Sequence, residues 1–228
     1  MHWTASELAV VALSLKVALV GTVASLPFAV LVALALARGR FWGRSLLNAL
    51  IHLPLVLPPV VTGYALLRMF GRHGSVGEWL GDHLGIVFAF RWTGAALAAA
   101  VMGFPLMVRA IRIAIESVDH GLEDAAATLG ASPAWTMATV TLPLALPGVV
   151  AGAIIGFAKA LGEFGATIMF VANIPGETQT LALAIFSLIE TPGAEAAVMR
   201  LAWLSIGISF FALLASEALA RRVTRSRE

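Results

Sequence analysis

The stretch 119–147, DHGLEDAAATLGASPAWTMATVTLPLALP, changes character twice between two long apolar runs. Acidic residues crowd its beginning and an alanine-rich body follows, which is typical of the start of a helix. Gly130 predicts a stop or a sharp turn, and Ser132 and Pro133 predict the N-cap and first residue of a second helix. The sequence therefore predicts two short helices that meet at a glycine and are joined rigidly to the apolar run that follows.

The chain on either side of this stretch is strongly apolar. Of its 228 residues, 60% are hydrophobic and 12% are charged, and its mean hydropathy is +0.92. Soluble domains are about 45–50% apolar and about 25% charged. A spanning helix needs about 20 apolar residues, and the segments that qualify are 9–37, 46–68, 93–110, 143–165 and 198–219. We therefore expect an all-α, polytopic membrane protein with five transmembrane helices, in a single domain over 1–228.

The central stretch also carries a spaced pattern: D-A-A, three residues, glycine, nine residues, a β-branched residue, any residue, and L-P. Its members are Asp124, Ala125, Ala126, Gly130, Val140, Leu142 and Pro143. This pattern resembles the signature E-A-A-x3-G-x9-I-x-L-P in the membrane subunits of ABC importers. Asp124 stands where that signature has Glu, with Glu123 beside it, and Val140 stands for Ile.

In that family the segment is a cytoplasmic coupling helix that docks in a groove of the ATPase subunit. The resemblance implies the core fold of a type I importer permease and a cytoplasmic coupling segment at 111–142. It also implies that the residues of the pattern, together with Glu123 and Leu129, couple the permease to the ATPase.

The arginines predict the same orientation. Cytoplasmic loops are rich in Lys and Arg. Nine arginines follow the first, third and fifth spans: Arg38, Arg40, Arg44, Arg109, Arg112, Arg221, Arg222, Arg225 and Arg227. Four lie toward the other side: Arg68, Arg72, Arg91 and Arg200. We expect a multi-pass protein of the bacterial inner membrane, with its N-terminus outside and its C-terminus and the 111–142 segment in the cytoplasm.

A second stretch, 159–186, holds charged groups at the edge of an apolar run. Lys159 and Glu163 are four residues apart and can pair on one helix face. Ionisable residues at such depth usually face protein or a water-filled cavity. The pair is either a self-neutralising structural pair or part of a translocation pathway. The candidate pathway residues are Lys159, Glu163, Phe164, Gly165 and Asn173.

This stretch carries a further resemblance, over nearly the whole chain. The strings A-L-G-E-F-G-A-T at 160–167, N-I-P-G at 173–176 and T-Q-T-L at 178–181 look like the permease subunit of molybdate ABC importers. Sulfate permeases carry a related G-E-F-G-A run, so permeases for sulfate, thiosulfate or tungstate stay open as alternatives. The resemblance implies a permease homodimer, two ABC ATPase subunits and a periplasmic oxyanion-binding protein, with membrane lipid around the spans.

The chain lacks the residues for other chemistry. A phosphate-binding loop needs G-x4-G-K-[ST], but Lys16 precedes Val17 and Lys159 precedes Ala160. We therefore expect no catalytic residue and no cofactor in this chain, with ATP and Mg²⁺ bound by the partner ATPase. There is no H-E-x-x-H motif and no cysteine, and no metal site or nucleic-acid-binding surface is expected. An ATP-independent carrier is the more distant alternative, but it gives no reason for the ordered central segment.

Two spans have unusual helical features. Pro54, Pro58 and Pro59 predict a kink in the second span, because each proline removes a backbone donor. The fourth span has a small residue at every fourth position: Gly148, Gly152, Gly156 and Ala160. Such a stripe lets two helix backbones approach closely.

Overall fold

The computed structural model describes residues 4–225, with side chains as far as Phe211 and at Leu214, and all regular elements in this range are helical. The elements are α1 (Ala5–Arg38), α2 (Arg44–Val56), α3 (Pro59–Phe70), α4 (Ser75–Leu84), α5 (Trp92–Glu116), α6 (His120–Thr128), α7 (Pro133–Thr136), the π-helical turn η1 (Met137–Thr141), α8 (Leu142–Leu161), α9 (Gly165–Val171), α10 (Leu181–Ile189) and α11 (Glu195–Arg225).

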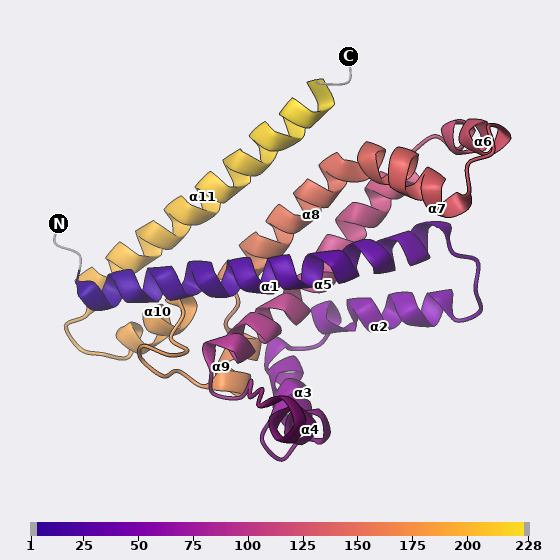
Figure 1. Ribbon diagram of the computed structural model, residues 1–228. Coiled ribbons are helices and arrows are strands. Elements are labelled where there is room, and N and C mark those ends of the chain that lie inside the picture. Colours follow the sequence, from indigo (N-terminus) through magenta and orange to yellow (C-terminus); the bar gives the residue numbers. More distant parts are fainter. Residues whose placement is uncertain (1–3, 226–228) are drawn as a thin grey trace.

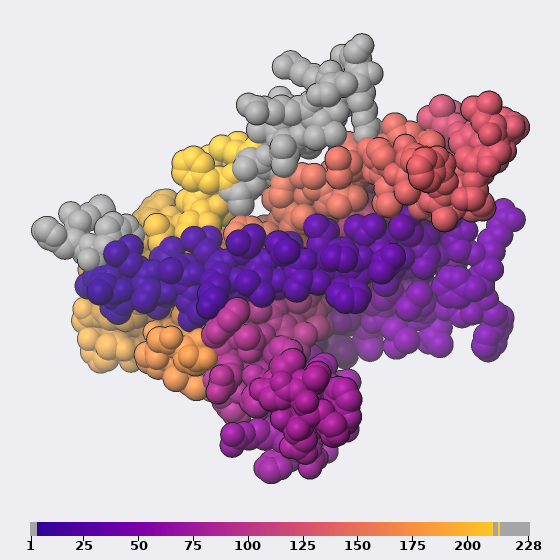
Figure 2. All heavy atoms as spheres, viewed as in Figure 1, coloured from indigo at the N-terminus to yellow at the C-terminus, as the bar shows by residue number. Residues whose placement is uncertain are grey.

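The long helix α1 runs along one face of the molecule, from the α10 end to the α6 and α7 end (Figures 1 and 2). A capping box starts it: the Thr4 side chain accepts from the Glu7 backbone N–H, and the Glu7 carboxylate accepts from that of Thr4. Small residues let α1 approach α5, since a Cβ at Gly21 would meet the Ala96 carbonyl oxygen at 2.7 Å. The core therefore forms where α1 and α8 pack against α5.

The predicted stripe on the fourth span packs α8 against α5. A Cβ at Gly152 would meet Ile111, and one at Gly156 would meet Met107. Met107 and Ile111 are both fully buried. The small residues of α8 thus form the surface on which α5 lies, as the sequence predicts.

The prolines of the second predicted span have a larger effect than a kink. Leu57 is extended (φ −70°, ψ 145°), because the residue before a proline is pushed out of the helical region. The axes of α2 and α3 differ by 113° across this break. The expected continuous helix over 46–68 is therefore two helices, which form either one broken span or a re-entrant loop.

Two other predicted segments end differently in the structure. The expected third span, 93–110, lies within α5, which continues to Glu116, so the first residues of the expected coupling segment, 111–142, belong to this helix. The expected fourth span, 143–165, ends at Leu161, because the chain leaves the helix at Gly162 and Phe164 before α9 begins. Within the described residues, three helices are long and apolar enough to cross a membrane, or four if α2 and α3 count as one span. The exact number of five stays a prediction, with 198–219 lying inside α11.

The close packing of α8 on α5 predicts the effect of a larger side chain. Gly156→Val should lower the free energy of unfolding by about 1–3 kcal/mol, the usual cost of overpacking, because a Cβ there would meet Met107 Cγ and Sδ at 2.6 Å. Gly207→Val in α11 is the matched control, since a Cβ at Gly207 meets nothing within 4 Å. Thermal unfolding of the purified chain in detergent measures both. Equal losses in the two variants would contradict this packing.

Candidate functional site

The predicted pair of helices exists at one end of the molecule (Figure 1). Asp119 caps α6 by accepting from the Gly121 N–H at 2.8 Å. Gly130 then turns the chain with a left-handed φ of +86°, and Ser132 caps the next helix by accepting from the Trp135 N–H at 3.3 Å. That next helix continues through η1 into α8, as one 29-residue run from Pro133 to Leu161. The second predicted helix is therefore continuous with the following span, and the rigidity of this connection stays a prediction.

The Glu123 carboxylate joins three elements at this end. Its Oε1 accepts from Arg38, at the end of α1, at 3.2 Å from Nε and 3.0 Å from Nη2. The same oxygen accepts from the Thr141 hydroxyl in η1 at 2.6 Å. The side chain of Glu123 is 18% exposed and that of Arg38 is 16% exposed. Charge-assisted bonds in a mostly buried setting are stronger than neutral ones, so this carboxylate fixes α6 against the membrane-spanning helices.

These contacts shift the titration of Glu123. Burial by itself raises the pKa of the carboxyl group, but the hydrogen bonds from Thr141 and Arg38, the positive charge of Arg38 and the hydrogen bond from His120 act in the other direction. The net effect lowers the pKa of Glu123 below its ordinary value of 4.5. Glu123 is therefore ionised at neutral pH, as its pairing with Arg38 requires.

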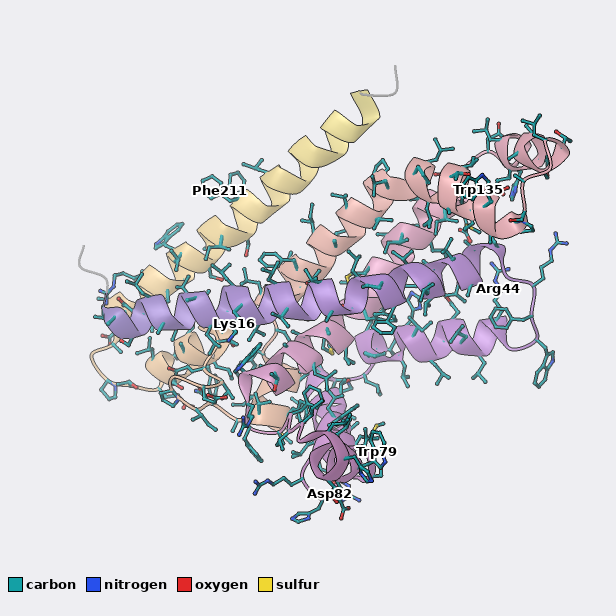
Figure 3. All side chains as sticks on the ribbon, viewed as in Figure 1. Lys16, Arg44, Trp79, Asp82, Trp135 and Phe211 are labelled. Carbon is teal, nitrogen blue, oxygen red and sulfur yellow. The ribbon has the colours of Figure 1, made fainter. Side chains whose placement is uncertain are left out.

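The outward side of the same segment is apolar. Leu129 is 90% exposed and Trp135 is 65% exposed. They border a shallow groove whose other lining residues are Ala126, Gly130, Ala131, Ser132 and Thr139. Figure 3 shows Trp135 at the same end of the molecule as Arg44. Large exposed apolar residues on a polar end are typical of a protein contact site.

Some of the coupling residues predicted from the sequence face the packed helices, and others face outward. Glu123 faces inward, whereas its neighbours Asp124 and Ala125 are exposed. Val140 and Leu142 are half-buried where the helix enters α8, and Pro143 is exposed there. The acidic residue that matches the family signature by spacing, Asp124, is thus not the one that holds the segment in place.

The predicted ion pair lies at the other end of α8. Lys159 Nζ donates to Glu163 Oε2 at 2.6 Å, and Glu163 Oε1 accepts from the Ala166 N–H at 3.0 Å. Glu163 lies beyond the end of α8, not on the same helix as expected. Glu163 is only 3% exposed. Its carboxylate bonds to Lys159 of α8 and to Ala166 of α9, and it therefore connects the two helices across the break.

This break meets the break between α2 and α3. A Cβ at Gly165 would meet Pro59 Cβ at 2.7 Å, and one at Gly63 would meet the Ala166 carbonyl oxygen. The two interrupted helix pairs therefore touch through Gly165 at the start of α9 and through Gly63, about one turn into α3. Irregular backbone at membrane depth is tolerated only where it is buried in protein or lines a water-filled cavity.

Two further candidate residues lie beside the α8–α9 break. Phe164 packs on Phe186 of α10 with ring centroids 5.1 Å apart. Asn173 donates to the Leu183 carbonyl and to the Ser187 hydroxyl. The candidate pathway residues therefore gather around the α9–α10 region, and α8 connects them to the coupling segment across 20 residues, about 30 Å.

The sequence analysis missed three residues of the site. Arg38 counted only toward orientation, and Thr141 and Trp135 were not singled out. Nothing in the local sequence marks Arg38, because its partner Glu123 lies 85 positions away. Thr141 lies 18 positions from Glu123, and only the fold back through Gly130 brings the two side chains together. In the described part of the chain, no group of three His, Asp or Glu side chains is arranged to hold a metal ion.

Comparison with known proteins gives one consistent result. The family model "Binding-protein-dependent transport system inner membrane component" matches residues 25–225. The chain is 55% identical to the molybdenum transport system permease protein ModB of Escherichia coli K12 over 227 residues, which is 100% of this chain and 99% of that protein. It is 53% identical to the protein of the same name from Haemophilus influenzae over 96% of each chain. The sulfate transport system permease protein CysT of Escherichia coli is 40% identical over 70% of this chain and 57% of its own length.

Solved structures show the same fold. A bacterial ABC transporter that imports the acidic polysaccharide alginate matches with a TM-score of 0.76 at 16% identity, over 97% of this chain and 81% of that chain. The inward-facing MetNI methionine ABC transporter matches with a TM-score of 0.68 at 18% identity, over 96% and 94% of the two chains.

The lowered pKa of Glu123 predicts how stability depends on pH. A carboxyl group whose pKa is lower when folded contributes stability that is complete above its unfolded pKa and is lost as the pH falls through the folded pKa. We expect the wild-type chain to be more stable than Glu123→Gln at pH 7. This difference should begin to shrink as the pH approaches 4.5 and should disappear as the pH falls through the lowered pKa of the folded state. Thermal unfolding of both variants from pH 7 to pH 3 measures it. A difference that is unchanged at pH 3, or already lost at pH 6, would contradict the contacts of Glu123.

Proposed function

Because the chain belongs to the family of inner membrane components of binding-protein-dependent transport systems, we propose that it is the permease subunit of an ATP-driven importer of molybdate. The assignment of molybdate as the substrate rests on the 55% identity of this chain, along its whole length, to a molybdenum transport permease. The sulfate relative matches over a smaller share of both chains. Permeases for sulfate, thiosulfate or tungstate are the alternatives, since these oxyanions share shape and charge with molybdate.

The coupling end supports a contact with a separate ATPase. Leu129 and Trp135 offer an apolar surface to a partner, and α6 lies outside the packed spans (Figure 1). The chain has no phosphate-binding loop of its own. In this proposal ATP and Mg²⁺ bind to the partner, and the groove beside Gly130 receives part of that partner.

The arginines at the end of the molecule that carries α6 and α7 support an orientation in the membrane. Arg38, Arg44 and Arg112 all make ion pairs or hydrogen bonds near the coupling segment. A surplus of arginine is typical of the cytoplasmic side. We therefore place this end in the cytoplasm, and the N-terminus with the loop that contains Asn173 outside, where a periplasmic oxyanion-binding protein docks.

The transport path runs between two copies of the chain. Even with the five spans that the sequence predicts, one copy has too few helices to surround a gated path for a hydrated dianion. The helix breaks at Pro59 and Gly165 are the points where a small movement of α8 would open or close the path. Lys159 supplies positive charge there, and its bond to Glu163 is the contact that a passing anion would compete with.

Molybdenum content tests the substrate. In a strain that lacks this chain, cellular molybdenum measured by elemental mass spectrometry should fall at trace molybdate, because the specific importer is gone. High molybdate in the medium or a plasmid copy of the gene should restore it, with sulfur supply unaffected. Normal molybdenum together with impaired sulfate uptake would instead assign the chain to the sulfate permeases.

A further inference from the structure

The residue Arg38, which the family signature does not include, holds more partners than any coupling residue predicted from the sequence. Besides its two bonds to Glu123, its Nη2 donates to the carbonyl oxygens of Ile115 and Val118, at 3.0 and 3.3 Å. Ile115 lies in the last turn of α5, where helical carbonyls lack partners within the helix, and Val118 lies two residues beyond the end of α5. One guanidinium therefore ties the ends of α1 and α5 to each other and to α6.

The second partner of Glu123, Thr141, lies on the other side of the turn at Gly130. Thr141 is 1% exposed and lies in η1, at the start of α8. Since an ionised carboxylate only accepts hydrogen bonds, the Thr141 hydroxyl donates to it. A π-helical turn is a common position for a functional irregularity in a helix, and this one is bonded to α6 through a single oxygen atom of Glu123.

His120 contacts both Arg38 and Glu123 on the solvent-exposed side of these residues. Its Nδ1 lies 3.2 Å from Glu123 Oε2 and its Nε2 lies 3.3 Å from Arg38 Nη1. A neutral imidazole with its proton on Nδ1 satisfies both contacts, because it then donates to the carboxylate and accepts from the guanidinium. The arrangement leaves both oxygen atoms of Glu123 bonded.

The covalent link between α6 and α7 consists of Leu129, Gly130, Ala131 and Ser132. The backbone N–H groups of Gly130 and Ala131 donate to the carbonyl oxygens of Ala127 and Ala126 at the end of α6. Gly130 has a left-handed φ of +86°, and a Cβ there would meet nothing within 4 Å. The bonds of Glu123 to Arg38 and Thr141 therefore add side-chain connections from α6 to α1 and to η1, beyond the turn itself.

We infer that Arg38, Glu123 and Thr141 form a positioning latch that makes α6, the ends of α1 and α5, and the start of α8 move as one body. The inference rests on the proposed function, since the latch matters only if a partner pulls on α6. Arg38, Glu123 and Thr141 act through α6 and α8 and contact neither the transported anion nor ATP. A movement of the ATPase would then be transmitted along α8 to the helix break at Gly165. It would also be transmitted along α1 to the core.

The test compares variants in the whole importer: the permease with its ATPase, reconstituted in liposomes with the binding protein. The quantity measured is molybdate imported per ATP hydrolysed. Thr141→Val removes the hydroxyl at nearly constant shape, and Thr141→Ser restores it. Thr22→Val is the matched control, because the Thr22 hydroxyl is buried on α1 away from the coupling segment and has no hydrogen-bond partner in the described part of the chain.

We expect Thr141→Val to lower the import per ATP by about fivefold or more, the lower end of typical coupling effects, with Glu123→Gln and Arg38→Lys at least as severe. Thr141→Ser should recover most of the ratio, and Thr22→Val should leave it unchanged. A role in folding alone would reduce the amount of assembled complex without changing the ratio.

An unchanged ratio in Thr141→Val, in complexes that assemble normally, would overturn the latch. If Glu123→Gln fails to assemble, the Val and Ser variants at Thr141 still decide the question. An error in the proposed substrate would be recognised separately, because the wild-type complex would then import sulfate and not molybdate. In that case the sulfate imported per ATP hydrolysed would test the latch in the same variants.

Discussion

The carboxylate of Glu123 is the constraint on which the rest of this structure depends. A mostly buried carboxylate is stable only if its charge and its lone pairs are matched. Arg38 supplies the charge and Thr141 supplies a short hydrogen bond. Arg38 is the last residue of α1, and Thr141 is the last residue of η1, just before α8. The requirement to satisfy one side chain thus fixes where the ends of α1, α6 and α8 lie relative to one another.

The helix α8 carries this fixed end across the membrane. Its small residues let it lie directly on α5, with Met107 and Ile111 filling the contact, so it can move only together with its neighbours. At its far end the chain breaks at Glu163, next to the break that precedes Pro59. The rigid part of the molecule therefore ends where the backbone is irregular, which is where a movement would have its effect.

Local chemistry in the sequence was enough to predict α6, the turn at Gly130 and the cap at Ser132, since each depends on residues only a few positions apart. It was also enough to predict the Lys159–Glu163 pair. It could not choose between Glu123 and Asp124, because the choice depends on Arg38, 85 positions away. The prolines predicted a kink, but the size of the bend depends on how α3 packs on α9 through Gly63 and Ala166.

The most direct test of the central claim is a distance between α1 and α6 in the working importer. The chain has no cysteine, so spin labels at Leu31→Cys, 62% exposed on α1, and at Thr128→Cys, exposed on α6, would be unique. Pulsed electron–electron double resonance gives this distance with and without bound ATP, on complexes in liposomes assembled from labelled chain diluted with unlabelled chain, so that one copy per complex carries the labels. A single latch predicts one narrow distance that is the same in both states. A distance that broadens, or that changes by as much as one helical turn, about 5.4 Å, would contradict it.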